Sequence, residues 1–232
     1  MNVSISRPVA RTTGLLYLAM AFVGVPGFLV IRPVLFDHDS PAATMAQLVE
    51  NEALARVGIG LELALVIVQA LTALWFFRLF RTVDRFAAGA LAAFGTVNAI
   101  AILVSAAGLA TALEAALGGD AAGTQLMYAL SGSLWGVGAV FFGLWLVPMG
   151  LLARPAGMPR ALGWILVAGG IGYVASAFVG YVVPDAGPLA QLLTAPATVG
   201  EFWMIGLLLW HGLRRTPAPA TEATHQEAPA EA

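Results

Sequence analysis

The stretch that decides the fold runs from residue 132 to residue 183 and reads GSLWGVGAVFFGLWLVPMGLLARPAGMPRALGWILVAGGIGYVASAFVGYVV. Two apolar segments without an ionised side chain flank a short turn. Each has about 20 residues, the length that an α-helix needs to cross a hydrocarbon core of roughly 30 Å. The turn, residues 154–160, contains two prolines and two arginines, so both helices end there, at a membrane face that accepts positive charge. This stretch therefore predicts two transmembrane helices folded back on each other.

The composition extends this interpretation to the whole chain. Hydrophobic residues make up 59% of the 232 residues and charged residues only 10%, against roughly 25% charged residues in soluble domains. The predicted fold class is all-α, a polytopic membrane helix bundle. The eleven basic residues are all arginine and the formal net charge is −2, which indicates no nucleic-acid partner. The chain has no cysteine, which excludes disulfides and thiolate chemistry, and we expect no cofactor and no metal site.

Apolar segments and the breaks between them predict six transmembrane helices in one domain, residues 1–215. The tail, residues 216–232, is rich in Pro, Ala, Thr and Glu and is predicted to be disordered in the cytoplasm. The first helix should kink at Gly24, Pro26 and Gly27. The expected helices cover residues 13–36, 57–77, 86–113, a fourth from 126 or 134 to 153, 161–183, and a sixth that either begins near Leu189 and kinks at Pro196 or begins at Thr194.

A shorter helix is expected between the first two transmembrane helices. Ser40 can act as its N-cap and Pro41 as its first residue, because proline is favoured at that position. Met45, Leu48 and Leu54 follow at roughly helical spacing. Two interpretations fit this pattern: an amphipathic helix lying on the membrane surface, or a solvated loop helix that makes no lipid contact.

The arginines predict the orientation of the bundle. Six helices place both termini on one side of the membrane, and the side with more arginine is normally cytoplasmic. With cytoplasmic termini, nine arginines lie inside and two outside, a strong bias. The inner nine are Arg7, Arg11, Arg78, Arg81, Arg85, Arg154, Arg160, Arg214 and Arg215, and the outer two are Arg32 and Arg56.

Small residues recur four positions apart, in two pairs on the fourth predicted helix and in one continuous series on the fifth. Such spacing lets two helix backbones approach closely in a membrane, so we expect these two faces to meet. The residues concerned are Gly132, Gly136, Ala139 and Gly143 on the fourth helix and Ala168, Gly172, Ser176 and Gly180 on the fifth.

Several motifs together resemble one bacterial membrane family. Residues 141–173 read FFGLWLVPMGLLARPAGMPRALGWILVAGGIGY, a Pro-Asp turn follows, and residues 196–212 read PATVGEFWMIGLLLWHG. RTTGLLYLAMA at residues 11–21 and ARVGIGLELAL at residues 55–65 also fit. This set resembles the family catalogued as domain of unknown function 4386, over about residues 7–213.

The resemblance implies a multi-pass protein of the bacterial cytoplasmic (inner) membrane, and it brings no established reaction. One feature departs from the family pattern, in which a histidine is expected early in the fourth helix. This chain reads ALSGSLWG there, at residues 129–136. Any role that depends on that imidazole is therefore in doubt for this chain.

Five polar residues within the predicted helices are the candidate site. Ionisable side chains inside a membrane are costly and mark functional sites by default, which singles out Glu62 and Glu201. Counted from the arginines that flank their helices, both lie roughly 20–24 Å above the cytoplasmic face. The same count brings Asn98 and Tyr173 to this level and places Gln69 two turns below Glu62 on the same helix face.

Two interpretations of this level remain open. In the first, the residues line an outward-opening cavity that binds a small polar ligand, a cation or a proton. Two carboxylates at one depth repel each other unless one is protonated or a cation lies between them, which is how such a site would work. In the second, the groups only satisfy one another, or the two glutamates are N-terminal acids favoured by the helix dipole.

Three function classes follow from these interpretations: a protein that binds or transports a small ligand, a non-catalytic scaffold or partner-binding subunit, and an intramembrane enzyme that uses a carboxylate as acid or base. The enzyme has least support, because no phosphate loop, nucleophile elbow or zinc-protease motif is present, and no catalytic residue is assigned. The lipid bilayer is the expected partner, and a homo-oligomer is compatible with the sequence.

Overall fold

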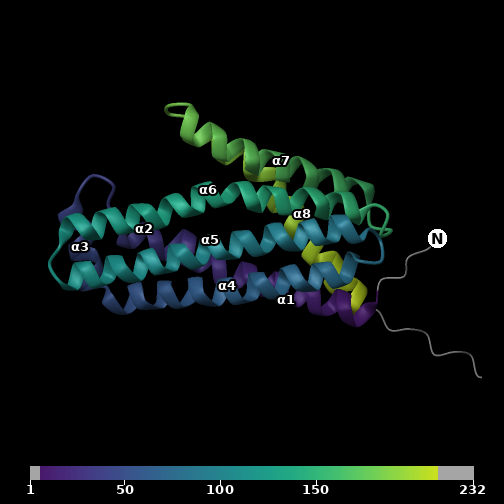
Figure 1. Ribbon diagram of the computed structural model, residues 1–232, viewed down its shortest axis with the longest axis horizontal. Coiled ribbons are helices and arrows are strands. Elements are labelled where there is room, and N and C mark those ends of the chain that lie inside the picture. The colour runs from purple at the N-terminus through teal and green to yellow at the C-terminus, as the bar shows by residue number, and fades with distance from the viewer. Residues whose placement is uncertain (1–5, 214–232) are drawn as a thin grey trace, which may run out of the picture.

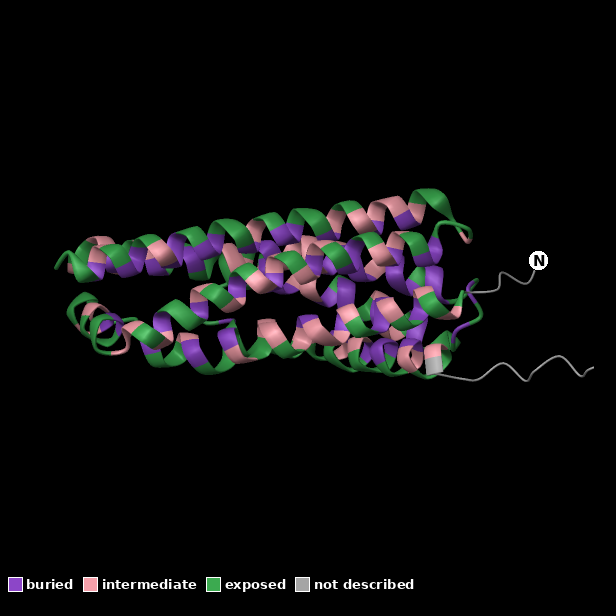
Figure 2. Ribbon diagram, turned by 90° about the horizontal axis from the view of Figure 1, so that it is seen from below, coloured by how far each residue is buried: buried purple, intermediate pink, exposed green. Residues whose placement is uncertain are grey.

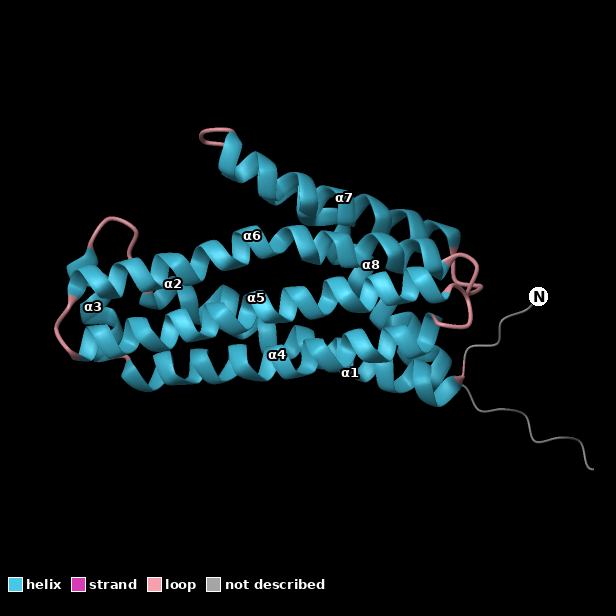
Figure 3. Cartoon of the chain, in the orientation of Figure 1, coloured by secondary structure: helices cyan, strands magenta, loops and turns pink. Residues whose placement is uncertain are grey.

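The computed structural model describes residues 6–213, and this part of the chain is helical with short connecting turns and no strand (Figure 3). The first segment is continuous but changes its helix type, from α1 (Arg7–Val25) through the π-helix η1 (Pro26–Ile31) to α2 (Arg32–Leu35). The later elements are α3 (Pro41–Glu50), α4 (Glu52–Phe80), α5 (Arg85–Leu117), α6 (Ala121–Ala153), α7 (Arg160–Val182) and α8 (Gly187–Leu213). The disorder predicted for residues 216–232 lies outside the described residues.

Six of the described segments are long and apolar enough to cross a membrane. They are α1 to α2 taken together, α4, α5, α6, α7 and α8. Consecutive segments run in opposite directions, so α1 begins and α8 ends at one end of the bundle (Figure 1). We call this the terminal end, and the opposite end, where α3 lies, the α3 end. The chain is therefore an integral membrane protein of the multi-pass class.

The six segments form a closed ring. Each spanning segment packs against the next one in the chain, and α1 packs against both α4 and α8. Towards its C-terminal end α7 diverges from α6 (Figure 1). The closed ring allows side chains from helices far apart in sequence to meet inside the bundle.

Two hydrophobic clusters fill the bundle, and buried positions face inward along the helices (Figure 2). The larger cluster surrounds Trp145, Tyr17 and Phe76, which are at most 1% exposed. The smaller one lies at the α3 end and includes Leu48 and Tyr128. Many large apolar side chains on the outside of the spanning helices are exposed, as expected for a surface in contact with lipid.

Several predicted helix boundaries are wrong by one or more turns. The fourth predicted helix begins at Ala121, well before Leu126 or Leu134, because the Asp120 side chain accepts a hydrogen bond from the Gly123 amide and caps it. For the sixth, the predicted alternative near Leu189 is close, since the helix begins at Gly187 and continues through Pro196. A proline inside a transmembrane helix is tolerated where its surroundings satisfy the freed backbone groups.

The predicted break in the first helix is confirmed as a change of helix type. The π-helix η1 begins at Pro26, two residues after Gly24, and includes Gly27. The predicted cap of the shorter helix is also confirmed, since the Ser40 side chain accepts a hydrogen bond from the Ala43 amide at 3.1 Å. The location of α3 at the membrane surface stays a prediction.

Close packing of the fourth and fifth predicted helices through small residues is confirmed, although part of the predicted face is wrong. A Cβ atom on Gly143 would clash with the carbonyl oxygen of Gly170 on α7, and one on Gly150 with that of Gly163. Gly172, which was expected on this face, instead approaches the Leu193 carbonyl of α8. The fifth predicted helix therefore presents small residues to both of its neighbours.

Candidate functional site

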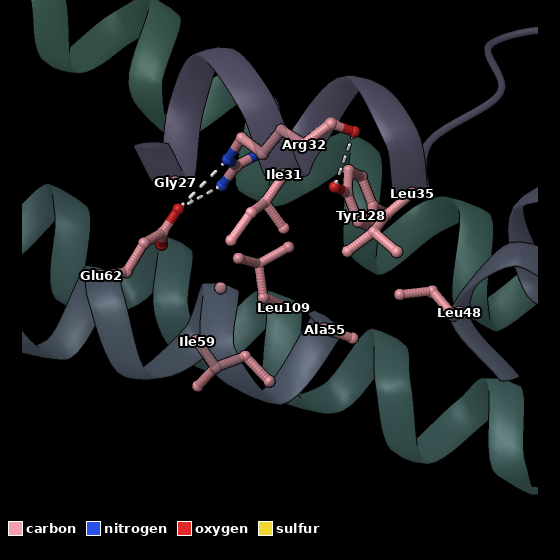
Figure 4. Close-up of a pocket in the computed structure, with 11 residues that line it drawn as sticks. Gly27, Ile31, Arg32, Leu35, Leu48, Ala55, Ile59, Glu62, Leu109 and Tyr128 are labelled. Atoms are coloured by element: carbon pink, nitrogen blue, oxygen red, sulfur yellow. Dashed lines mark hydrogen bonds and ion pairs between the residues drawn. The ribbon is translucent and has the colours of Figure 1, made fainter. Parts of the chain in front are cut away.

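Glu62 is the centre of a polar site in the apolar interior. It lies ten residues into α4, about 15 Å from the start of that helix, and is 4% exposed. Its Oε1 atom accepts hydrogen bonds from Arg32 Nη2 at 2.7 Å and Arg32 Nε at 3.1 Å (Figure 4). The two side chains form an ion pair whose members are 11% and 5% exposed.

The π-helix places Arg32 at this site. Arg32 is the first residue of α2 and directly follows η1, whose wider turns shift the helix face. π-helical segments are frequent at functional sites. Arg32 was predicted to lie at the outer end of the first helix, residues 13–36, with no partner assigned. It lies in a helix as predicted, and its side chain is directed inward, to Glu62.

Two serines and a tryptophan complete the polar site. Arg32 Nη2 also donates to Ser105 Oγ of α5 at 2.9 Å and to Ser131 Oγ of α6 at 2.6 Å, and the two hydroxyls lie 2.8 Å apart. Trp135 Nε1 of α6 donates to Glu62 Oε1 at 3.1 Å. Four segments of the ring, α2, α4, α5 and α6, therefore converge on one carboxylate oxygen and one guanidinium.

Aromatic rings enclose the guanidinium. Its central carbon lies 5.7 Å from the centroid of the Tyr128 ring and 5.9 Å from that of Trp135, within the range of cation–π attraction. Tyr128 also donates from its hydroxyl to the Arg32 carbonyl at 3.3 Å. The cation is thus stabilised by an anion, two hydroxyls and two ring faces.

The two carboxylate oxygens of Glu62 differ in their hydrogen bonding. Oε2 is buried and has no hydrogen-bond partner among the described residues, whereas Oε1 accepts three N–H groups. A small cavity adjoins the ion pair, with room for about one water molecule (≈10 Å³). Apart from Arg32, Glu62 and Tyr128, its lining is apolar: Gly27, Ile31, Leu35, Leu48, Ala55, Gly58, Ile59 and Leu109 (Figure 4).

Glu201 has a different partner. Its Oε1 accepts a hydrogen bond from the Tyr17 hydroxyl of α1 at 2.6 Å. The Tyr17 ring packs on Phe76 and Trp145, with centroids 5.3 Å and 6.1 Å away. The Trp145 indole N–H is buried without a partner in the described part of the chain. Glu201 therefore joins α8 to α1 next to the larger hydrophobic cluster.

The other predicted site residues also lie inside the bundle. Gln69 is 1% exposed and its Nε2 lies 3.4 Å from the Gly95 carbonyl oxygen of α5, while Asn98 is 6% exposed. The Tyr173 ring packs on Phe142, with centroids 4.9 Å apart. Within residues 6–213 no hydrogen bond or ion pair joins any two of the five predicted residues. One shared site for all five stays a prediction.

Sequence analysis missed the residues that hold the two glutamates: Arg32, Ser105, Ser131, Trp135 and Tyr17. The one available signal was Arg32, an ionisable residue that already lay within the first predicted helix, residues 13–36, and so qualified as a candidate by the same rule as the glutamates. The serines gave no signal, because small polar residues are common in membrane helices. Within the described part of the chain, no group of three or more His, Cys, Asp or Glu residues could hold a metal ion.

The six apolar segments and the buried ion pair define a class: multi-pass membrane proteins with a polar centre inside the helix bundle. Residues 12–212 match the family model described as "Domain of unknown function (DUF4386)". The chain therefore belongs to the DUF4386 family. Comparison with curated proteins and with solved structures found no match.

Proposed function

We propose that this protein binds a small polar ligand, a cation or a proton at Glu62, within the half of the bundle at the α3 end. The arginine distribution predicts that this is the outer half of the membrane. One observation carries the proposal: Glu62 is a buried carboxylate that lines a cavity, and its Oε1 atom accepts three hydrogen bonds while Oε2 has no partner among the described residues. Native proteins leave few buried polar atoms unpaired.

Stability alone does not account for this arrangement. Replacing a buried ion pair by apolar side chains of similar volume is often neutral or stabilising, because removing two charges from water costs about as much as their attraction returns. A buried oxygen without a partner adds a further cost of about 1–3 kcal/mol. A bound proton or hydrogen-bond donor at Oε2 would remove that cost.

The geometry favours some ligands over others. Arg32 already neutralises Glu62, so an added cation would have to approach a guanidinium, and an added anion would have to approach a carboxylate. The cavity has room for about one water molecule. A proton or a small neutral hydrogen-bond donor therefore fits the closed site best, and a cation requires Arg32 to move away.

The test compares Glu62→Gln with the unaltered protein in detergent. Thermal unfolding is followed across pH and across concentrations of sodium, potassium and ammonium, since a ligand that binds the folded state raises the Tm. We expect at least one of these variables to change the Tm of the unaltered protein and of Glu114→Gln, an exposed control on α5, but not of Glu62→Gln. Equal responses of all three proteins would overturn the proposal.

A scaffold role is the second candidate, and one observation favours it. The contacts of Arg32 with Ser105 and Ser131 tie α2 to α5 and α6, as a purely structural polar network would. A scaffold predicts that Glu62→Gln changes stability by the same amount under every condition. The wider site, with Glu201, Asn98, Tyr173 and Gln69, is tested by adding Glu201→Gln to the same series, because residues of one site show non-additive effects.

A further inference from the structure

We infer that α3 and the loop before it, residues 36–50, form a lid that controls entry to the Glu62 cavity from the α3 end. This inference rests on the proposed function, because it specifies how the same site is reached. The lid segment lies between the two elements that supply the ion pair, α2 with Arg32 and α4 with Glu62. Leu48 of α3 lines the cavity and is 2% exposed.

The lid is built as one rigid piece. Thr44 Oγ1 donates to the Asp37 carbonyl at 3.0 Å and accepts from the Asp37 amide at 3.1 Å. Asp37 Oδ1 accepts from the amides of Asp39 and Ser40, at 2.9 Å and 3.0 Å. These local bonds join the loop to the first turns of α3, so the loop and the helix would move together.

A hinge connects the lid to α4. Asn51 is the only residue between α3 and α4, and its backbone angles, φ −111° and ψ 36°, are not helical. Hinges are typically a few residues at the ends of elements that absorb a change in backbone angles. A rotation at Asn51 would lift Leu48 from the cavity while leaving α4 in the ring.

Leu48 anchors α3 in the smaller hydrophobic cluster, whereas the loop before α3 is held to α6 by two hydrogen bonds and one ring contact. Gln125 Nε2 of α6 donates to the carbonyl oxygens of Asp37 and His38, at 2.9 Å and 3.3 Å. The Phe36 ring stacks on Tyr128 of α6 with centroids 4.7 Å apart. Elements held by few and partly exposed contacts open at lower free energy than the core. Gln125 therefore acts as a latch.

Tyr128 of α6 links the lid to the ion pair. Tyr128 contacts the lid through Phe36 and also donates to the Arg32 carbonyl, and its ring lies beside the Arg32 guanidinium. Opening of the lid would thus remove Leu48 from one side of the cavity and disturb the Tyr128 contacts on the other. Entry to the cavity and release of Arg32 from Glu62 would be coupled through Tyr128.

The test uses the absence of cysteine in this chain, which makes a single introduced thiol a clean reporter. Ala55 lines the cavity and is 4% exposed, so Ala55→Cys reports access to the cavity. The purified variant in lipid nanodiscs is treated with a charged methanethiosulfonate reagent, and the labelling rate is measured without any ligand. We expect Gln125→Ala to raise this rate roughly tenfold, because two hydrogen bonds that hold the lid closed are lost.

Two controls separate lid opening from general loosening. Gln191→Ala removes another exposed glutamine, on α8, and should leave the rate unchanged. Ala88→Cys, fully buried on α5 and in the larger hydrophobic cluster, should stay unreactive in the Gln125→Ala background. If Gln125→Ala left the labelling rate of Ala55→Cys unchanged, or raised that of Ala88→Cys equally, the proposed lid would be wrong. Since no ligand is present, this result is independent of whether Glu62 binds one.

Discussion

At the scale of single residues, the two glutamates inside the spanning helices are held in different ways. Glu62 has a charged partner and one carboxylate oxygen without a partner among residues 6–213, whereas Glu201 has a neutral partner, the Tyr17 hydroxyl. A charge in the bundle interior is stable only when paired or neutralised by a proton. The energetic role of Arg32 can therefore be isolated by removing it with and without Glu62.

Arg32→Met should destabilise the protein by about 3–5 kcal/mol, because it leaves the Glu62 carboxylate buried and unpaired. Adding Glu62→Leu to the same chain should recover most of this loss, since neither charge then remains. The measurement is the free energy of unfolding in mixed detergent micelles. If Arg32→Met alone were as stable as the unaltered protein, the Arg32–Glu62 ion pair would not have the energetic role given to it here.

The exposed ion pair on the same helix gives a matched control. Arg56 and Glu52 also lie 2.7 Å apart, but their side chains are 62% and 41% exposed. Exposed pairs contribute about 0–1 kcal/mol, so Arg56→Met should change the stability by less than about 1 kcal/mol. The comparison separates the effect of burial from the effect of losing an arginine.

At the scale of elements, close backbone contacts between α6 and α7 determine how these helices pack. Gly143 and Gly170 approach each other so closely that neither has room for a Cβ atom, and Gly150 and Gly163 do the same two turns further along. Van der Waals packing of this kind is a main source of helix association in membranes.

Gly143→Ala should therefore destabilise the protein by about 1–3 kcal/mol, because the added methyl group forces the two backbones apart. Gly132→Ala on the same helix is the control, since a Cβ atom there has no neighbour within 4 Å. That change should be neutral or stabilise the helix by up to about 1 kcal/mol. Unfolding in the same micelles measures both, and equal effects would show that the α6–α7 contact is unimportant.

At the scale of the whole molecule, the ring of six spanning segments places both described ends of the chain at the terminal end (Figure 1). The turns that hold Arg81 and Arg154 lie at the same end, and α3 with its acidic loop lies at the other. The orientation of this bundle in the membrane decides whether the lid faces the cytoplasm or the outside.

The positive-inside bias predicts that the terminal end is cytoplasmic. Reporter fusions placed after Arg81 and after Arg154 should show cytoplasmic activity, and fusions after Asp39 and after Asp120 should show activity on the opposite side. The reverse result, with cytoplasmic activity after Asp39 and Asp120, would show that the bundle has the opposite orientation and that the lid faces the cytoplasm. An alternation that does not follow the six segments would contradict the fold.

By itself the sequence determined the class of protein, the six spanning segments, the break in the first helix, the capped short helix and the use of glycine between α6 and α7. These features depend on local hydropathy, on proline and glycine, and on the spacing of small residues, all of which act within one or two helices. It also singled out Glu62 and Glu201 as the ionisable residues within the predicted membrane helices.

Only the tertiary structure decided their partners. Arg32 lies 30 positions before Glu62, and Ser131 lies 99 positions after Arg32, so the pairing depends on which helices are neighbours and how each is rotated. The π-helix rotates Arg32 inward, and closure of the ring brings Tyr17 to Glu201. Depth along a helix can be counted from residue numbers, whereas rotation about its axis is set by packing against the whole bundle.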